Sequence, residues 1–285
     1  MNGLLNYKAI CKLKYDLLRL NAPPDTGGAN WDNVANMYNE MTQMEKNSTA
    51  YALSLLPITK KDSVVDIGCG PGRLSVPLAK MAKSVTSVDA FGKMLEFTQK
   101  NAQKAGLDNI NFVQKSWLDD DALKVIGKHD IVIASRSVGL NDIDKLNLIA
   151  KKYVVLMCFF ESSLRQITQN FLVGVREQKL PARPCKEDER TFGYNITFNL
   201  VYDMGANPNI RIITDIYEKD FQSREQAYEF FRFLGEIPKD KEKIYKENVD
   251  KYVFETKNGF RFEQKARSYL MWWDTREIKK PKGKP

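Results

Sequence analysis

Cysteine and histidine are both scarce in this 285-residue sequence, which has four cysteines and one histidine. No two cysteines show the C-x-x-C spacing, so the sequence favours reduced thiols over a disulfide framework or a zinc site. We therefore expect no bound metal. The four cysteines are Cys11, Cys69, Cys158 and Cys185.

Long apolar runs are also missing. The longest strictly apolar run, residues 154–160, has seven residues, whereas roughly 20 are needed to cross a bilayer. Lysines and Asp16 interrupt the apolar residues near the N-terminus, and no small-residue cleavage site follows them, so a signal peptide is not expected. These features predict a protein without a membrane span and with a cytoplasmic location.

Acidic residues are fewer than basic ones, giving a net charge of +8 and a pI near 9.1. Half of that excess lies in residues 278–285, which hold four lysines and no acid and have the composition of a disordered Lys/Pro tail. Elsewhere the two signs alternate, as in residues 239–243, which favours a solvated helix face. Nucleic acid is therefore a possible partner but not the favoured one.

The most specific stretch of the sequence is residues 63–73. Residues 63–67 are apolar and β-branched enough for a strand buried on both faces, apart from the acid Asp66. Three alternating glycines follow, Gly68, Gly70 and Gly72, and they leave the backbone open to close contact with a ligand. Pro71 suits the first turn of a helix, so the pattern predicts a strand, a ligand-binding loop and a helix.

The glycine spacing distinguishes two kinds of ligand. The dinucleotide fingerprint G-x-G-x-x-G would need glycine at Arg73, whereas the observed pattern is Asp-x-Gly-x-Gly-x-Gly from Asp66. A carboxylate suits a ligand with an ammonium group and no phosphate, and S-adenosylmethionine (SAM) is such a ligand. The segment resembles motif I of the class I SAM-dependent methyltransferases. Cys69 is interpreted as a small residue of the loop, and the resemblance implies that Asp66, Cys69 and the three glycines contact the cofactor.

A second acid supports this interpretation. Asp89 ends the next predicted strand, 84–88, and follows Asp66 by 23 residues, close to the roughly 20 expected before the acid that binds ribose. Helix capping is the alternative role of such an acid. The resemblance to the methyltransferases also implies that Ala90 and Met94 lie near the nucleoside.

The segments after the third and fourth strands match the family pattern less closely. In the family, the loop after the third strand, 111–114, brackets the adenine. Here the usual acidic position holds Ser116, with Trp117 beside it, so Asp119 is an alternative polar group. The resemblance implies that Ser116 and Trp117 contact the cofactor.

The fourth strand, 130–135, ends at Ser135 beside the expected binding edge, and the resemblance includes this residue among the cofactor contacts. No N/D-P-P-Y-type motif follows it, which disfavours methylation of flipped bases. Arg136 either orients an anionic acceptor or pairs with a carboxylate of the fold. His129 precedes the strand at its opposite end, so we do not expect it to act as a general base.

The N-terminal region contains two predicted helices. Residues 4–20 are amphipathic, and this helix either covers part of the core, which we favour, or forms part of a lid. Residues 21–28 form a hinge. Trp31 and Tyr38 then fall on one helix face, and the segment resembles small-molecule methyltransferases of the quinone-ring type, which implies that both line the cofactor or substrate pocket. Core aromatics would show the same pattern.

Together these elements predict an α/β fold: a doubly wound, mostly parallel seven-stranded sheet with an antiparallel last strand, an N-terminal helical lid and a helical insert after the fifth strand. The expected parts are an N-terminal helix and hinge (1–29), a SAM-binding Rossmann-like core (30–160), a helical insert or substrate cover (161–207), strands and helices that complete the sheet (208–277) and the tail (278–285).

The favoured function is in-line SN2 transfer of a methyl group from SAM to a small-molecule acceptor, leaving S-adenosylhomocysteine. Because the sulfonium already activates the methyl group, a catalytic base is optional, and the sequence identifies none. The candidate catalytic residues are Tyr38 and Arg136, which are also substrate-pocket candidates. The alternatives are an RNA or protein methyltransferase and a SAM-binding sensor or structural subunit without turnover. The insert after the fifth strand could also form a homodimer surface.

Overall fold

A computed structural model describes residues 5–20, 31–161, 170–176 and 193–279 of the chain. The predicted hinge at 21–28, residues 162–169 and 177–192 of the expected insert, and the tail beyond 279 lie outside these residues. No helix in the described part of the chain is both long and apolar enough to span a membrane.

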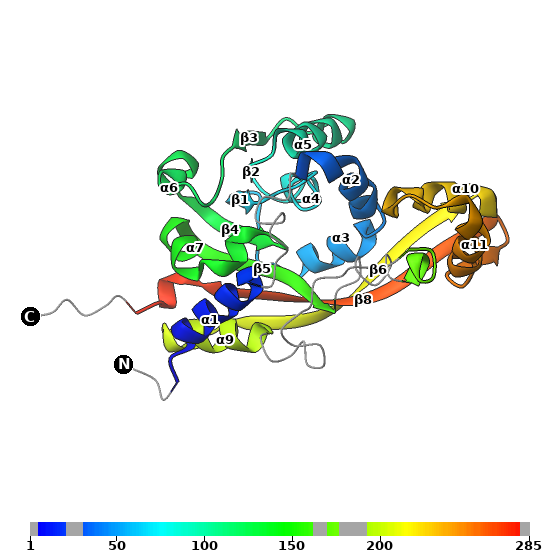
Figure 1. Cartoon of the computed structure of the whole chain (residues 1–285). Helices are drawn as coiled ribbons and strands as arrows, with labels where there is room; N and C mark the ends of the chain where they lie inside the picture. The colour runs from blue at the N-terminus through cyan, green and yellow to red at the C-terminus, as the bar shows by residue number, and fades with distance from the viewer. Residues whose placement is uncertain (1–4, 21–30, 162–169, 177–192, 280–285) are drawn as a thin grey trace, which may run out of the picture.

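The centre of the fold is one mixed sheet (Figure 1). Its strands run in the order β3-β2-β1-β4-β5-β8-β6, and β7 pairs with β8 outside this path. Neighbouring strands from β3 to β5 are parallel, whereas β8 is antiparallel to β5, β6 and β7. This confirms the mostly parallel sheet with an antiparallel last strand and adds β7. The strands are β1 (Ser63–Ile67), β2 (Ser84–Asp89), β3 (Ile110–Gln114), β4 (His129–Ser135), β5 (Ala150–Glu161), β6 (Asn209–Phe221), β7 (Val253–Thr256) and β8 (Gly259–Asp274).

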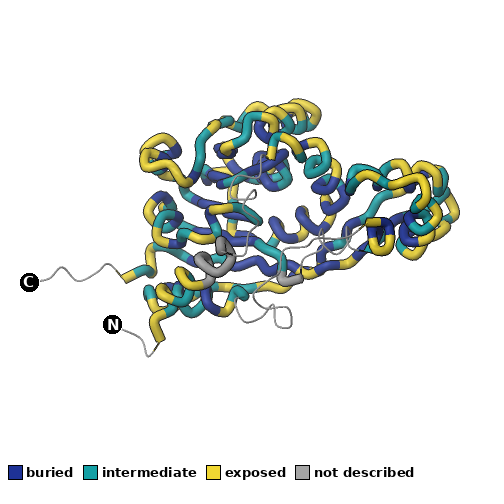
Figure 2. Tube along the Cα trace, in the orientation of Figure 1, coloured by how far each residue is buried: buried dark blue, intermediate teal, exposed yellow. Residues whose placement is uncertain are grey.

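Helices cover both faces of the sheet because its central strands bury alternate side chains on opposite sides. Val65 of β1 packs in a cluster with helices α6, α7 and α9, whereas the adjacent Val64 packs with α3 and α4. The dark tube of the central strands in Figure 2 shows this burial. The helices are α1 (Tyr7–Leu20), α2 (Ala35–Gln43), α3 (Lys46–Ser54), α4 (Ser75–Ala79), α5 (Gly92–Lys104), α6 (Ala122–Ile126), α7 (Ile143–Ile149), α9 (Tyr194–Asp203), α10 (Arg224–Phe231) and α11 (Glu242–Asp250).

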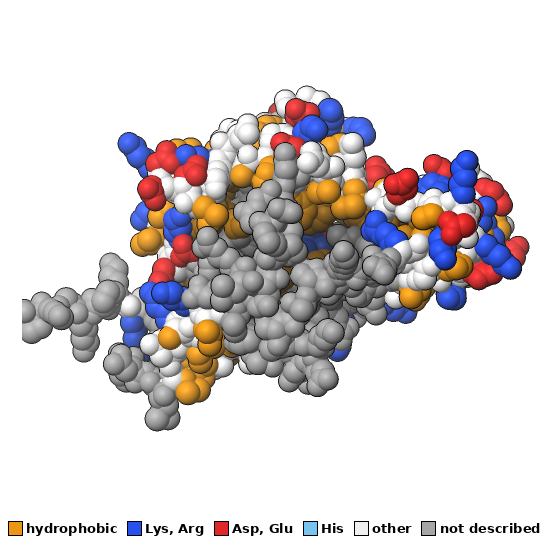
Figure 3. All heavy atoms as spheres, viewed as in Figure 1, with side chains coloured by type: hydrophobic (Ala, Val, Ile, Leu, Met, Phe, Trp, Pro, Cys, Tyr) orange, Lys and Arg blue, Asp and Glu red, His pale blue; other side chains and the backbone are white. Residues whose placement is uncertain are grey.

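A third hydrophobic cluster lies at the far end of the long antiparallel strand pair β6–β8, which extends beyond the parallel strands (Figure 1). Phe231 of α10, Tyr245 of α11 and Phe262 of β8 are fully buried in it. Side chains of both charge signs are interspersed over the outside of α10 and α11 (Figure 3), as predicted for residues 239–243. Short 3-10 helices complete the fold: η2 (Trp31–Val34), η3 (Val138–Asn141), η4 (Arg232–Leu234), η5 (Lys239–Lys241) and η6 (Thr275–Glu277).

Several element boundaries differ from those expected. The helix after the glycine loop is only the five-residue α4, because the loop turns with positive φ as far as Gly72. The chain between β4 and β5 forms η3 and then α7, and β5 begins at Ala150. Helix α1 packs against α9 and reaches α7 through an ion pair between Lys8 and Asp144.

Candidate active site

A cavity of about 520 Å³ lies at the carboxyl ends of β1 to β4. This is the edge at which open α/β sheets bind ligands, and the volume is typical of a small-molecule site. Three sequence segments that were expected to meet there do so: the glycine loop, the end of β2 and the N-terminal aromatic pair. The lining residues are Trp31, Tyr38, Ile67, Gly68, Gly70, Val88, Asp89, Ala90, Phe91, Met94, Lys115, Ser116, Trp117, Leu118, Arg136, Ser137, Val138 and Asn141.

The glycine loop is folded in a way that excludes side chains. Gly68 and Gly70 have φ values of 70° and 55°, a region that residues with a Cβ rarely adopt. A Cβ on Gly68 would lie 2.5 Å from the Cβ of Ser137, and one on Gly70 would lie 3.3 Å from the ring of Tyr38. The backbone of Gly68 and Gly70 therefore forms part of the cavity wall. Cys69 and Gly72, which were also predicted to contact the cofactor, are not among the lining residues.

Asp89 is held by the loop that it faces. One carboxylate oxygen accepts a hydrogen bond from the Gly70 N–H at 2.8 Å, and the other accepts one from the Phe91 N–H at 3.0 Å. Burial raises the pKa of Asp89 above its usual range, although these amides oppose the shift. Because a carboxylate has about four lone-pair directions, Asp89 retains acceptor capacity toward the cavity.

Asp66 lies behind the loop rather than in the cavity wall. It is buried, and its carboxylate accepts a hydrogen bond from the Ser75 hydroxyl at 2.7 Å. Burial raises the pKa of Asp66 to about 6, against the opposing effects of Ser75 and the Arg73 guanidinium. Asp66 thus supports the turn from β1 into α4. Its direct contact with the ammonium group of a ligand stays a prediction.

Trp31 and Tyr38 lie together at the cavity, although Trp31 is 38% exposed. Their rings pack edge to face with centroids 5.4 Å apart. Asp32 accepts a hydrogen bond from the Lys93 N–H at 2.9 Å, which attaches η2 to the start of α5. The helix that borders the cavity is therefore the second predicted one, α2 with η2, while α1 supplies no lining residue.

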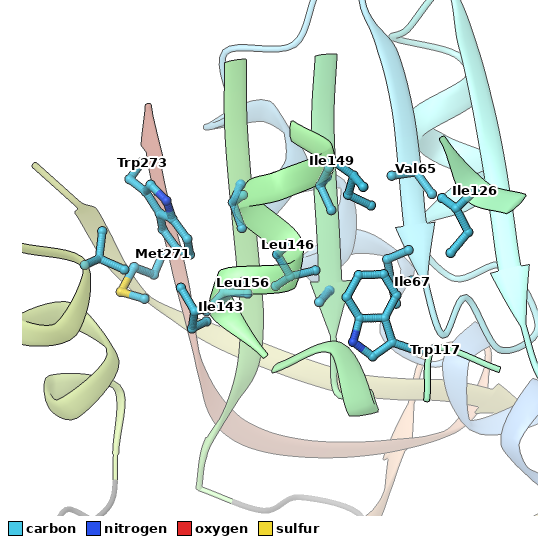
Figure 4. Packing of buried hydrophobic residues seen from close by; sticks show 14 of the residues in the cluster. Val65, Ile67, Trp117, Ile126, Ile143, Leu146, Ile149, Leu156, Met271 and Trp273 are labelled. Atoms are coloured by element: carbon cyan, nitrogen blue, oxygen red, sulfur yellow. The ribbon is translucent and has the colours of Figure 1, made fainter. Parts of the chain in front are cut away.

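Ser116 and Trp117 also line the cavity, as do Lys115 and Leu118. Trp117 is buried beside Ile67 in the cluster on the α7 side of the sheet (Figure 4). Among the described residues, its indole Nε1 has no hydrogen-bond partner. Lys115 forms ion pairs with Asp119 at 2.9 Å and with Asp121 at 2.5 Å.

In the described part of the chain, one non-glycine residue has a positive φ, and this residue is Arg136 with a φ of 52°. Its guanidinium donates to Glu45 at 2.7 Å and to Asp215 at 3.4 Å, and it lies 3.8 Å from the ring centre of Phe159. Burial alone would raise the pKa of Glu45, but Arg136 and Arg73 outweigh it and hold that pKa below its usual value. The structure therefore shows Arg136 paired with carboxyl groups of the fold.

Ser135 is not a lining residue, and its hydroxyl accepts a hydrogen bond from Arg73. Residues 136–139 follow the fourth predicted strand, and the chain beyond the carboxyl end of a parallel strand is expected at the binding edge; Ser137 and Val138 of this segment line the cavity. Asn141, which also lines the cavity, was not singled out from the sequence, although the same strand end was the signal available for it. His129 lies at the opposite end of β4, as predicted.

Residues 58–191 match the model of a protein family described as "Methyltransferase domain". An uncharacterized protein of Haemophilus influenzae is 29% identical over 236 residues, which cover 79% of this chain and 81% of that protein.

Two named methyltransferases match over shorter segments. The 23S rRNA (uracil(1939)-C(5))-methyltransferase RlmD of Photobacterium angustum is 40% identical over 75 residues, covering 26% of this chain and 34% of that protein. A probable cobalt-precorrin-6B C(15)-methyltransferase (decarboxylating) of Methanobrevibacter smithii is 37% identical over 81 residues, covering 28% of this chain and 42% of that protein. Both matches span less than half of the relative.

Among solved structures, a precorrin 8w decarboxylase of Methanobacterium thermoautotrophicum gives a TM-score of 0.47 at 15% identity, covering 80% of this chain and 89% of that one. The magnesium protoporphyrin IX methyltransferase ChlM of Synechocystis PCC 6803 with bound SAH gives a TM-score of 0.42 at 17% identity. The match covers 94% of this chain and 99% of that one. Likenesses at this level carry no conclusion about the acceptor.

The strand order, the glycine loop and Asp89 are those expected of a class I SAM-dependent methyltransferase. The family match over residues 58–191, just under half of the chain, supports a methyltransferase with SAM as its cofactor. The cavity fits this cofactor, because its wall has bare glycine backbone at Gly68 and Gly70 and the acceptor carboxylate of Asp89 beside it.

Proposed function

We propose that this enzyme transfers a methyl group from SAM to a small-molecule acceptor rather than to RNA or protein. One observation supports the proposal most directly: the two Lys or Arg side chains that line the cavity each contact two carboxyl groups. Lys115 pairs with Asp119 and Asp121, and Arg136 pairs with Glu45 and Asp215. A phosphate backbone needs basic groups that can exchange counterions for phosphates, and paired cations of this kind serve that purpose poorly.

The positions of the lining residues also support our proposal for how the cofactor is bound. We propose that Asp89 accepts hydrogen bonds from the ribose hydroxyls, that Ala90 and Met94 border the nucleoside, and that Ser116 and Trp117 border the adenine. When bound, SAM supplies a methyl group activated by its sulfonium. The protein's part is to hold the acceptor in line with that methyl group, which is chiefly a matter of position and orientation.

Trp31 and Tyr38 are our candidates for holding the acceptor. Tyr38 lies against Gly70, and burial raises the pKa of its phenol although Arg136 and Arg73 oppose the shift. The phenol is therefore protonated at neutral pH and can donate a hydrogen bond. Two aromatic rings at a steep angle favour an acceptor with a flat apolar part.

The test is to supply the purified enzyme with SAM labelled in its methyl group together with a cell extract separated into small molecules, RNA and protein. We expect label to enter the small-molecule fraction and Tyr38→Ala to reduce the rate at least about tenfold by loss of positioning. Tyr51→Ala is the matched control, because Tyr51 is an exposed tyrosine on α3 outside the cavity.

Label in ribonuclease-sensitive or protease-sensitive material would contradict the proposal. The first result would favour an RNA acceptor, in line with the partial similarity to the 23S rRNA methyltransferase. Tight SAM binding with no transfer to any fraction would favour a sensor or a structural subunit.

A further inference from the structure

Three large apolar side chains that line the cavity are also exposed to solvent. They belong to Trp31, Leu118 and Val138, whose exposed fractions are 38%, 66% and 47%. They come from η2, from the loop after β3 and from η3, three segments that lie far apart in the sequence. Because all three side chains line one cavity and face solvent, they mark its mouth, and we call them the rim residues.

The loop that carries Leu118 is held in place by polar contacts. Lys115 pairs with Asp119 and Asp121 of the same loop. The Leu118 N–H donates to the Ser116 hydroxyl at 3.2 Å. These contacts use the polar groups of the loop and leave the Leu118 side chain uncovered. The exposure of Leu118 is therefore a property of the folded loop.

Val138 is turned outward by the packing of the next residue, Gly139. A Cβ on Gly139 would lie 3.0 Å from the Ala134 side chain and 3.1 Å from that of Ile67. This face of η3 is therefore pressed against the carboxyl ends of β1 and β4. Consecutive residues of a 3-10 helix lie about a third of a turn apart, which leaves Val138 on the outer side.

The mouth of the cavity favours an apolar occupant over an anionic one. Exposed apolar groups that gather at a groove mark binding sites, and covering them is favourable because it removes apolar surface from water. The two cations of the cavity, Lys115 and Arg136, already pair with carboxyl groups. Since the rim residues share a cavity rather than one helix or sheet face, an occupant that enters the cavity fits them better than a protein that covers a surface.

We propose that the methyl acceptor carries an extended apolar part, which leaves the cavity across the rim residues while the reacting end stays inside. The acceptor is then a lipid-soluble small molecule. A fully water-soluble acceptor would leave the rim residues uncovered. The inference rests on the proposed small-molecule acceptor and narrows it to one chemical class.

The test offers the purified enzyme and methyl-labelled SAM two small-molecule fractions of a cell extract, one soluble in chloroform and one in water. We expect label to enter the chloroform-soluble fraction. Leu118→Asn combined with Val138→Asn, the rim variant, should raise the amount of this fraction needed for half-maximal rate on the order of a hundredfold, about tenfold for each apolar side chain removed. The maximal rate and the affinity for SAM should stay within about twofold of the wild type, because the rim residues contribute only to acceptor binding.

The matched control is Val125→Asn combined with Leu148→Asn. These side chains are 49% and 61% exposed, and neither lines the cavity. They lie on α6 and α7, close in sequence to the amino ends of β4 and β5. The control variant should transfer methyl groups like the wild type.

Label confined to the water-soluble fraction would overturn this inference and leave the proposed small-molecule function intact. Equal dependence on the chloroform-soluble fraction in the rim variant and the wild type would also overturn it. Label in RNA or protein, or no transfer to any fraction, would overturn both the inference and the proposed function.

Discussion

Gly68 illustrates how one residue fixes the cofactor loop. Its φ of 70° and its close approach to Ser137 both exclude a side chain. Gly106 has a similar φ of 66° but open space where a Cβ would lie. We expect Gly68→Ala to lower the free energy of unfolding by about 1–3 kcal/mol more than Gly106→Ala does, because only the first adds a steric conflict to the backbone strain.

Urea denaturation of the two variants measures this difference. Gly68→Ala should also weaken SAM binding, since the loop must move to relieve the contact with Ser137, whereas Gly106→Ala should not. Equal losses of stability for the two variants would show that the close approach of Gly68 to Ser137 is not a constraint of the folded protein.

The raised pKa of Asp66 predicts that the stability of the protein depends on pH. Its folded pKa of about 6 lies above the unfolded value of 3.8, so between these two pH values the folded state keeps a proton that the unfolded state has lost. Stability therefore falls as the pH rises through this window, by up to about 3 kcal/mol. Asp66→Asn removes the titration but keeps an acceptor for Ser75, so its stability relative to the wild type should improve from about pH 4 to about pH 7.

Denaturant titrations of both proteins across this pH range provide the measurement. Asp203→Asn, a change at an exposed position of α9, serves as the control and should show no such trend. A difference between Asp66→Asn and the wild type that stays constant with pH would contradict the raised pKa.

Among the elements, Arg136 connects the end of β4 to the α2–α3 junction and to the antiparallel strand pair β6–β8. Its partners Glu45 and Asp215 are buried, with side-chain exposures of 2% and 0%. Arg136→Met would leave both without their main cationic contact. We expect a loss of about 3–5 kcal/mol in the free energy of unfolding, the usual cost of removing one partner from a buried ion pair.

The matched control is Arg211→Met on the exposed side of β6, which should cost little. Adding Glu45→Gln to Arg136→Met should recover part of the stability, because an uncharged amide tolerates burial better than an unpaired carboxylate. If Arg136→Met and Arg211→Met lower the free energy of unfolding equally, the ion pairs of Arg136 with Glu45 and Asp215 do not link these elements.

The elements also show what the sequence could predict. The glycine loop and Asp89 were accessible because their chemistry is encoded within one βαβ unit, at a spacing set by one helix and one strand. The partners of Arg136 were not, because Glu45 and Asp215 lie 91 and 79 residues away along the chain. Only the pairing of β6 with β8 and the docking of α3 on β6 bring them together.

At the scale of the whole molecule, three hydrophobic clusters share one sheet. Alternation in residues 210–217 and the aromatic-rich residues 260–273 predict two strands, but β6 and β8 are longer and carry α10, α11 and β7 beyond the parallel strands. The hydrophobic periodicity of the sequence could not reveal this extension. The alternation of side chains along β6 is the same where the strand borders the central clusters and where it borders the distal one. Adjacent Trp272 and Trp273 face opposite sides of the strand, as alternation requires, and pack in different clusters.

Calorimetric titration of the full-length protein with SAM and with S-adenosylhomocysteine tests the central claim most directly. We predict that both bind, and that Asp89→Ala weakens each by roughly a hundredfold through loss of charged hydrogen bonds to the ribose. Asp203→Ala, at an exposed position of α9, should bind like the wild type. If neither ligand bound at millimolar concentration, or if Asp89→Ala bound both as tightly as the wild type, the cavity at the carboxyl ends of β1 to β4 would not be the cofactor site.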